Sequence, residues 1–202
     1  WNVRGLNNPS KHREVSHFIL SNKISLLALL ETRLRESNVN HVVKSIRRQW
    51  HFCSNHNASL PGRIVVMWDP AHIGFVPICV NEQALHGKVT LPNMQEVYDS
   101  FIYGLCDSRA RKQLWNDIIF CANRFKKTPW SLLGDFKFTR FSHEHSHCCR
   151  VTKSMEDFNC EIRSAEPDDL KSTGLKFTCN NMRSGATAIS KKLDRALGNW
   201  QW

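Results

Sequence analysis

The chain has 202 residues, of which 41% are hydrophobic and 23% are charged, a composition that excludes a largely disordered protein. This length suits one domain with a sizeable core. The formal net charge of +10 favours an anionic partner, most often a nucleic acid.

The first 48 residues are predicted to form two helices separated by a strand. A helix is expected over residues 10–21, with Ser10 as its N-cap and Val15, Phe18 and Ile19 on its buried face. The apolar run Ile24–Leu30 predicts a strand that is covered on both faces. A second helix is expected over Ser37–Arg48, with four residues directed inward: Val39, Val42, Val43 and Ile46.

The middle of the chain is predicted to be rich in strands, which the turn signals Pro61–Gly62 and Leu91–Asn93 separate. The expected strands are Trp50–Cys53, Ile64–Trp68, Gly74–Val80, Ala84–Leu91 and Val97–Gly104. Early alternation of helices with strands, followed by this strand-rich stretch, favours a layered α/β or α+β sandwich.

The last part of the chain is expected to begin with a helix from Ser108 to Phe125, whose apolar stripe is Leu114, Ile118, Ala122 and Phe125. A helix is then expected over Met155–Ile162. The predicted strands of this part are Trp130–Leu133, Leu175–Cys179 and Ile189–Leu197. No repeat or low-complexity linker indicates an internal domain boundary.

The cysteines and the apolar runs bear on the cellular compartment. The chain has 8 Cys, but no secretory segment opens it, and a domain of this size does not need disulfides. No apolar run approaches the roughly 18 residues of a membrane span. We therefore expect reduced cysteines, an intracellular location and no membrane partner.

Three short polar motifs follow or open apolar strands: Trp1-Asn2, Glu31-Thr32 and Gly134-Asp135. Any one of these acids alone is most simply explained as a solvated loop residue. Carboxylates at several strand ends, however, commonly converge on one metal, and Mg²⁺ prefers oxygen ligands, typically one or two carboxylates with water and substrate phosphate. The three motifs together therefore suggest a magnesium site.

Five segments occur in an order and spacing that resemble one family. They are Trp1–Leu6, Leu29–Arg33, Phe101–Gly104, Trp130–Phe136 and Lys192–Arg195. They resemble the apurinic/apyrimidinic endonuclease-like branch of the endonuclease/exonuclease/phosphatase superfamily, and within it the endonuclease domains of plant non-LTR (LINE-like) retrotransposons. The resemblance covers essentially the whole chain. It implies one domain over residues 1–202 with an α+β fold, the DNase I-like four-layer α/β/β/α sandwich of two mostly antiparallel mixed sheets.

The resemblance also implies roles for residues in the first half of the chain. Glu31 would be the direct ligand of Mg²⁺, with Mn²⁺ as an alternative. Asn2 would lie beside the metal and orient Glu31 or the phosphate. Tyr103 would hydrogen-bond the scissile phosphate, and Arg4 is expected to contact the substrate.

In the second half, the resemblance assigns Asp135 to the attacking water, which it would position or deprotonate. Asp194 would belong to the acid pair that holds a catalytic histidine. Lys137 is expected to contact substrate, but it stands where the family has Asn. We expect it to repel Mg²⁺ and to pair with Asp135, which would weaken Asp135 as a base. Cys179 likewise replaces an expected Trp.

The resemblance further implies that the extreme N-terminus of the family domain and its final Ser-Asp-His strand lie outside Trp1–Trp202. Loss of a general acid–base group usually lowers a rate by roughly 10²–10⁴-fold. A missing strand would also leave a sheet edge unpaired. We therefore expect this copy to be impaired.

Other clusters are less informative. The stretch His143–Cys149 is dense in metal-ligand types, but a zinc site usually takes two separated ligand pairs, and no second pair lies at a usual spacing. We interpret it as a variable loop. The basic clusters Arg47-Arg48 and Arg124–Lys127 are either solvated helix faces or contacts to a DNA backbone.

Three functions remain open from the sequence. The first is a metal-dependent endonuclease that nicks DNA in the nucleus and leaves a 3′ hydroxyl for the reverse transcriptase domain of an intact element. The second is a degenerate, non-catalytic remnant with residual nucleic-acid binding. The third is a relative that acts on another phosphoester, such as a phosphoinositide phosphatase or an exonuclease. The basic charge favours DNA over lipid.

Overall fold

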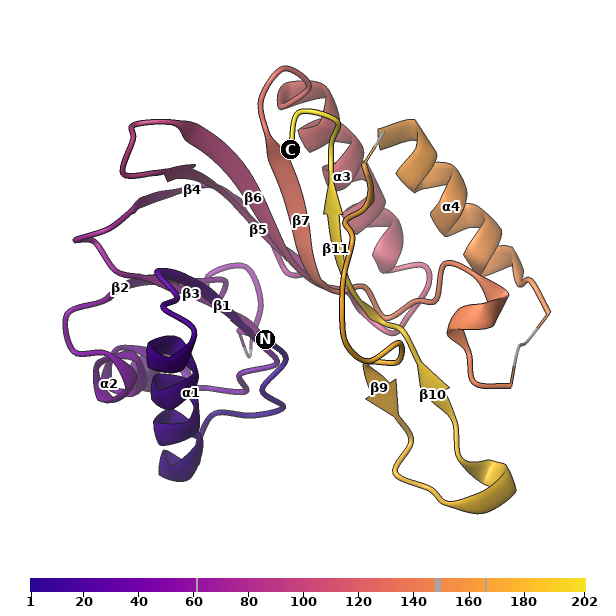
Figure 1. Ribbon diagram of the computed structural model, residues 1–202, viewed down its shortest axis with the longest axis horizontal. Helices are drawn as coiled ribbons and strands as arrows, with labels where there is room; N and C mark the ends of the chain where they lie inside the picture. Colours follow the sequence, from indigo (N-terminus) through magenta and orange to yellow (C-terminus); the bar gives the residue numbers. More distant parts are fainter. Residues whose placement is uncertain (61, 148–149, 166) are drawn as a thin grey trace. The chain divides into compact units, whose positions relative to one another are not determined.

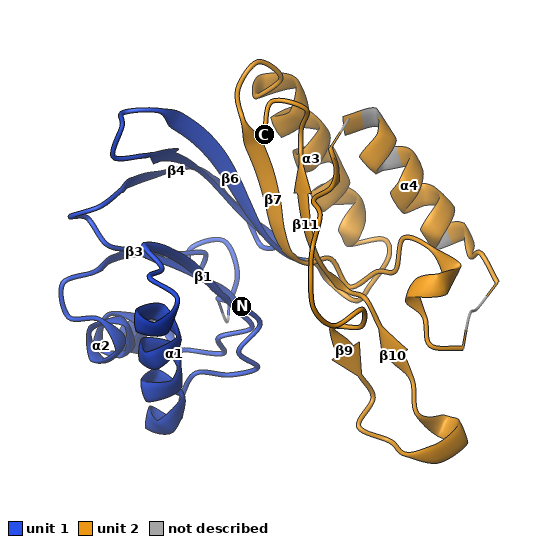
Figure 2. Ribbon diagram, in the orientation of Figure 1, with its two compact units in different colours: residues 1–103 blue, residues 104–202 orange. Residues whose placement is uncertain are grey.

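The computed structural model describes residues 1–60, 62–147, 150–165 and 167–202. The chain divides into two units, Trp1–Tyr103 and Gly104–Trp202, which Figure 2 colours separately. We describe each unit by itself, and the single domain expected over residues 1–202 stays a prediction. Within the described residues, no helix combines the length and apolar character needed to cross a membrane.

The described residues of the first unit form two helices and six strands, which Figure 1 labels. In chain order they are α1 (Pro9–Ser21), β1 (Leu26–Leu30), α2 (Glu36–Ile46), β2 (His51–Ser54), β3 (Ile64–Trp68), β4 (Gly74–Val80), β5 (Ala84–Thr90) and β6 (Glu96–Tyr103). Strands β1, β3 and β2 form an antiparallel sheet in that order, and β4, β5 and β6 pair antiparallel as a meander. The predicted elements of this unit are therefore confirmed, with ends that shift by at most two residues.

The start of α1 corrects a prediction. Asn8, not Ser10, is the N-cap: its side chain accepts a hydrogen bond from the Ser10 backbone N–H at 3.0 Å, and Pro9 occupies the first helical position. Val15 and Ile19 are buried as expected, because they lie four residues apart on one face. Phe18 is 39% exposed, since it lies off that face and its ring packs against Trp1 at 4.9 Å.

The core beneath α1 and α2 contains most of the residues that the helical periodicity of the sequence predicts to be buried. All four apolar residues predicted to face inward from α2 are buried. The helix ends at Ile46, two residues earlier than predicted, because Arg47 takes an extended conformation (φ −146°, ψ 104°). These side chains pack with Leu27 and Leu29 of β1 and with Val65 and Met67 of β3.

The two sheets of this unit pack through aromatic rings. The Phe75 ring on β4 lies 5.3 Å from Trp68 on β3 and 6.1 Å from Phe101 on β6. A Cβ atom at Gly87 would lie 2.1 Å from the Phe75 ring. Glycine is therefore required at this position of β5 so that the ring can lie across the strand.

His86 on β5 is fully buried and lies opposite Ser100 on β6, with 2.7 Å between its Nδ1 atom and the Ser100 hydroxyl. Burial lowers the pKa of His86 from 6.5 to about 4. Between about pH 4 and pH 6.5, His86 is therefore neutral in the folded chain but protonated in the unfolded chain. The stability contributed by His86 is full above pH 6.5 and is lost as the pH falls toward 4, by up to about 3 kcal/mol.

We therefore predict that the free energy of unfolding, measured in urea, falls between pH 7.5 and pH 5 partly through His86. In a His86→Gln variant, which keeps a hydrogen-bonding side chain, this fall should be about 2 kcal/mol smaller. Equal pH dependence in the two proteins would show that His86 does not carry the effect.

The second unit contains two long helices beside short strands (Figure 1). In chain order its elements are α3 (Arg111–Arg124), β7 (Trp130–Asp135), the one-turn 3-10 helix η1 (Ser142–Glu144), α4 (Lys153–Ala165), β8 (Asp168–Asp169), β9 (Cys179–Asn180), the one-turn η2 (Gly185–Thr187), β10 (Ser190–Lys191) and β11 (Asp194–Gly198). Strand β11 lies antiparallel between β7 and β8, and β9 pairs with β10 in a separate hairpin.

Two strand predictions in this unit are wrong in extent. Only Cys179–Asn180 of the apolar run after Leu175 is a strand, and Leu175 itself is 91% exposed. The strand expected over Ile189–Leu197 is split into β10 and β11. The split arises because the backbone N–H groups of Lys192 and Leu193 donate to Glu144 and Thr178 instead of to a neighbouring strand.

The start of α3 also differs from the prediction. The helix begins at Arg111 rather than after Ser108, because residues 107–110 form a turn in which the Ala110 N–H donates to the Asp107 carboxylate at 2.8 Å. Its expected apolar stripe is otherwise present, with Leu114, Ile118 and Phe125 buried.

Of the two turns predicted in the first unit, the one at Leu91–Asn93 is closed by a 2.9 Å hydrogen bond from the Leu91 N–H to the Gln95 carbonyl. The other cannot be compared, because Pro61 lies outside the described residues.

Candidate active site

The N-terminal segment lies alongside the end of β1. The Leu30 N–H donates to the Trp1 carbonyl at 2.8 Å, the Val3 N–H donates to the Leu30 carbonyl at 3.0 Å, and Asn2 forms a parallel bridge with Leu30. The next residue of the chain is Glu31. The pairing therefore places Asn2 beside the end of the strand that carries the predicted metal ligand.

Glu31 leaves β1 in a left-handed conformation, with φ of 56°. Its side chain is 11% exposed and forms an ion pair with the Arg33 guanidinium, which is 59% exposed. Its carbonyl accepts from the Gly5 N–H at 2.7 Å, which ties the corner to the N-terminal segment. The carboxylate is thus held in a fixed place, while its cationic partner is largely in solvent.

A left-handed backbone occurs at three of the predicted site residues and, among the described residues, also at Lys23, Arg33, Met94 and Met182. Arg4, Glu31 and Lys137 all have φ between 49° and 58°, a region that non-glycine residues rarely adopt. Such conformations persist only where the surrounding structure imposes them, and they are enriched at functional sites. A hydrogen bond helps to impose this conformation on Arg4, because its N–H donates to the Asn2 side chain at 3.2 Å.

Lys11 holds the Arg4 corner from helix α1, a role that the sequence analysis missed. Its Nζ atom donates to the carbonyl groups of Val3, Arg4 and Gly5 at 2.6, 3.3 and 3.0 Å. One half-buried ammonium group thus binds three carbonyl groups of this loop. Nothing in the sequence signals this contact, because a lysine in the first turn of a helix that begins with proline is common on protein surfaces.

Tyr103 ends β6 and is 6% exposed. Its N–H donates to the Gln83 carbonyl at 2.8 Å, and the Arg63 guanidinium lies 5.6 Å over its ring. The Arg63 carbonyl accepts from the Thr32 N–H at 3.3 Å. Arg63, which the sequence analysis did not single out, therefore links the Glu31–Thr32 corner to Tyr103.

In the second unit, Asp135 and Asp194 lie opposite each other at the ends of β7 and β11. The Asp135 carboxylate is buried and accepts from the Lys137 N–H at 3.0 Å and from the Lys137 ammonium group at 2.6 Å. The ion pair expected from the sequence is therefore present. The Gly104 N–H donates to the Asp135 carbonyl at 2.8 Å, and a Cβ atom at Gly104 would lie 2.8 Å from the Phe136 carbonyl oxygen, so that glycine is required there.

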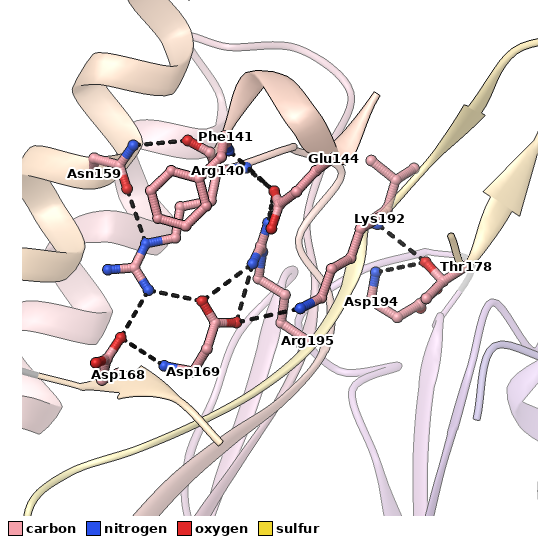
Figure 3. Close-up of polar contacts among 11 residues, drawn as sticks. Arg140, Phe141, Glu144, Asn159, Asp168, Asp169, Thr178, Lys192, Asp194 and Arg195 are labelled. Carbon is pink, nitrogen blue, oxygen red and sulfur yellow. Dashed lines mark hydrogen bonds and ion pairs between the residues drawn. The ribbon is translucent and has the colours of Figure 1, made fainter. Parts of the chain in front are cut away.

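Asp194 is a half-buried acid beside another acid. Burial raises the pKa of its carboxyl group above the usual value, and the nearby Asp135 carboxylate raises it further, while a hydrogen bond with Thr178 opposes the shift. The Thr178 hydroxyl oxygen accepts from the Asp194 N–H at 3.0 Å, as Figure 3 shows. A carboxyl group whose pKa is raised in this way binds a proton more readily than an exposed aspartate does.

A buried ionic network lies beside Asp194 and was not predicted (Figure 3). The fully buried Arg195 side chain pairs with Glu144 and with Asp169, the latter at 3.0 Å. Arg140 also pairs with Asp169, at 2.8 Å, and donates to Asn159 at 2.9 Å. The network ties η1, α4, β8 and β11 together and so holds the strand that carries Asp194.

The structure thus brings the predicted residues together in two groups. Asn2, Arg4 and Glu31 meet at the end of β1, and Arg63 connects this corner to Tyr103. In the other unit, Asp135, Lys137 and Asp194 meet at the ends of β7 and β11. Convergence of the two groups on one pocket stays a prediction.

The histidine-rich stretch is described only in part. The His143 ring stacks on Phe141 at 5.5 Å, and the rings of His145 and His147 lie 6.0 Å apart. Cys148 and Cys149 lie outside the described residues. Over the ranges that the structure covers, no group of three or more His, Cys, Asp or Glu residues is placed to hold a metal ion.

No family model and no curated protein matches the sequence. Solved structures do match. The endonuclease domain of TRAS1, a telomere-specific non-LTR retrotransposon, superposes with a TM-score of 0.71 at 9% identity, over 94% of this chain and 79% of that chain. D. rerio TDP2 complexed with a single-stranded DNA product gives 0.64 at 14% identity, over 98% and 81%. An endonuclease/exonuclease/phosphatase family protein from Bacteroides thetaiotaomicron gives 0.62 at 9% identity, over 98% and 80%.

At these identities the likeness shows the fold. The chain has the α+β fold of the endonuclease/exonuclease/phosphatase proteins, built from antiparallel and mixed sheets with few helices. The fold class predicted from the five sequence motifs is confirmed.

Proposed function

We propose that this chain, whose fold is that of the endonuclease/exonuclease/phosphatase superfamily, is a metal-dependent DNA endonuclease domain of the non-LTR retrotransposon type whose activity is impaired by Lys137. The net charge of +10 supports a nucleic-acid substrate. The matches to a retrotransposon endonuclease domain and to a DNA-complexed enzyme support DNA. In an intact element we expect a linked reverse transcriptase domain and a nuclear site of action.

The observation that carries the proposal is the corner at the end of β1. It holds a nearly buried carboxylate, Glu31, directly after the residue that pairs with Asn2, and the backbone is left-handed at both Glu31 and Arg4. A binding site needs side chains that the surrounding backbone holds in a fixed geometry. The corner coincides with the residues that the family resemblance assigns to metal and phosphate.

The corner fits Mg²⁺, with Mn²⁺ as an alternative. Glu31 offers carboxylate oxygens and Asn2 offers an amide oxygen, the hard donors that Mg²⁺ takes together with water and substrate phosphate. Arg33 now neutralises Glu31, but its side chain is 59% exposed and free of the core, so it can move to the phosphate. When bound, the metal would neutralise charge that develops on the scissile phosphate.

The chain's own residues would do the remaining work. Arg4 would bind a phosphate oxygen through its charge, and the Tyr103 hydroxyl would donate a hydrogen bond to the scissile phosphate. Asp135 would hold the attacking water and accept its proton. Asp194, whose pKa is raised by burial, would exchange a proton beside it.

Lys137 explains why we expect weak activity. Its ammonium group contacts the Asp135 carboxylate at 2.6 Å, in the place where a water would have to bind. The Lys137 side chain is only 17% exposed, so the contact is shielded from solvent. An asparagine would keep a hydrogen bond without occupying the carboxylate with a full charge.

The proposal is tested by measuring the nicking of supercoiled plasmid in Mg²⁺ and in EDTA. The purified chain is present in molar excess over the plasmid, so that a single turnover is observed. We expect slow nicking in Mg²⁺ and none in EDTA. A folded protein that binds DNA but nicks equally little with and without metal would instead identify a non-catalytic remnant, which is the alternative function.

We further predict that Lys137→Asn raises the nicking rate by about tenfold or more, equivalent to roughly 1.4 kcal/mol of barrier. The physical reason is the release of the Asp135 carboxylate from its ion pair. Lys191→Asn, which removes a lysine from the hairpin of the same unit, serves as the control for lost charge. If Lys137→Asn is no faster than the parent chain, Lys137 is not the cause of impairment.

A further inference from the structure

A cavity of about 480 Å³ lies between the first turns of α3 and α4 in the second unit. Figure 1 shows these two helices side by side. None of the residues proposed for catalysis lines the cavity. Its volume falls in the range of sites that hold a nucleotide-sized ligand.

The cavity is positively charged. Arg111, Lys112 and Lys153 line it against one carboxylate, Asp157. Because α3 begins at Arg111 and α4 at Lys153, the N-terminal ends of both helices also direct their partial positive charge to this region. The combination of three cations with two helix ends favours a phosphate-bearing ligand.

Arg111 is the buried cation of the cavity, with 3% exposure. Its guanidinium group donates to the carbonyl groups of Leu105 and Cys106, and over the described part of the chain no carboxylate forms an ion pair with it. Burial lowers the pKa of Arg111, while Cys106 and Asp107 raise it. Carbonyl groups orient the guanidinium but do not neutralise it, so an anion in the cavity would add countercharge to that of the nearby Asp107.

Two aromatic rings form the apolar part of the wall. Trp115 lines the cavity and packs against Phe158 at 4.9 Å, which fixes its ring. Phe138 also lines it, with the Arg111 guanidinium 3.6 Å over its ring. Aromatic rings beside cations are the surfaces on which single-stranded nucleic acids stack their bases.

Asp157, which also lines the cavity, favours a ligand that carries a nucleobase over a bare anion. Its carboxylate would repel an inorganic phosphate, but it can accept hydrogen bonds from the amino group of a base. We propose that this cavity binds one nucleotide unit of a single-stranded nucleic acid, with its phosphate at Arg111 and Lys112 and its base against the aromatic wall. This site goes beyond the proposed nuclease function and needs none of its residues.

The test is binding of a fluorescently labelled single-stranded oligonucleotide to the full chain in EDTA, where metal-dependent cleavage does not contribute. The double variant Lys112→Glu/Lys153→Glu changes two exposed cavity residues. Lys171→Glu/Lys176→Glu, at exposed positions between β8 and β9, makes the same change in net charge outside the cavity. We expect the Kd to rise at least about tenfold for the cavity pair and no more than about threefold for the control pair. Equal losses would overturn the proposal in favour of diffuse electrostatic attraction.

A second arm tests the base. An abasic oligomer of the same length should bind the parent chain at least about fivefold more weakly, and this difference should vanish in the cavity variant. Unlabelled deoxynucleoside monophosphates should compete, whereas inorganic phosphate at the same concentration should not. Equal binding of abasic and base-bearing oligomers would overturn the nucleotide assignment. Failure of the nicking assay would leave these results unaffected, so the two proposals are tested separately.

Discussion

Replacement of Glu31 by Gln should lower metal-dependent nicking by roughly 10²–10³-fold, the loss typical of removing one essential electrostatic group from an active site. Glutamine keeps the shape of the side chain but lacks the negative charge that Mg²⁺ requires. The measurement is best made in the Lys137→Asn background, where the starting rate is higher.

The matched control is Glu36→Gln, an exposed acid in the first turn of α2. It removes the same charge a few residues away and should leave the rate within about twofold. Loss of the Arg33–Glu31 pair should lower stability by no more than about 1 kcal/mol, because the Arg33 partner is largely exposed. A Glu31→Gln chain that is folded and nicks at the parent rate would remove Glu31 from the proposed site.

The second large effect concerns stability. Arg195→Met should lower the free energy of unfolding by about 3–5 kcal/mol, because it leaves the buried Glu144 carboxylate without its buried cation. Arg195 is fully buried and Glu144 is 4% exposed in its side chain, so water cannot replace the lost partner. Urea unfolding followed by circular dichroism measures the difference.

The double variant Arg195→Met/Glu144→Met separates an unpaired charge from lost packing. It should be more stable than the sum of the two single changes predicts, because neither charge is then left buried alone. Arg183→Met on the exposed β9–β10 hairpin controls for the loss of a surface arginine and should change stability by less than about 0.5 kcal/mol. Strict additivity of the two buried changes would show that Arg195 and Glu144 do not act as a pair.

Mutations in this network bear on function as well. Arg195 directly follows Asp194, and Asp169 joins Arg195 to Arg140 and to Lys192. A change that loosens β11 therefore displaces the carboxyl group proposed to exchange a proton. Nicking and stability should fall together in these variants, whereas Glu31→Gln should separate them.

The hydrophobic pattern was informative wherever an element is long and buries one face. Helix α2 buries all four residues that its spacing indicates, and β3 and β4 have the predicted bounds. Motif order was enough to predict the fold class, because those motifs lie at the ends of strands that the fold requires. Prediction failed where short-range polar bonds decide the structure, as at the Asn8 cap and in the split of β10 from β11.

The sequence by itself determined the positions of the main strands, the fold class and the local pairs that depend on neighbouring residues, such as Lys137 with Asp135. Only the tertiary structure decided the partners of charged groups that are distant in the chain. Arg195 pairs with Glu144 across 51 residues, and Arg63 contacts Tyr103 and Thr32 from a third segment. The physical reason is that periodicity reports burial of a face, whereas the partner of a buried charge depends on which loops the folded backbone brings together.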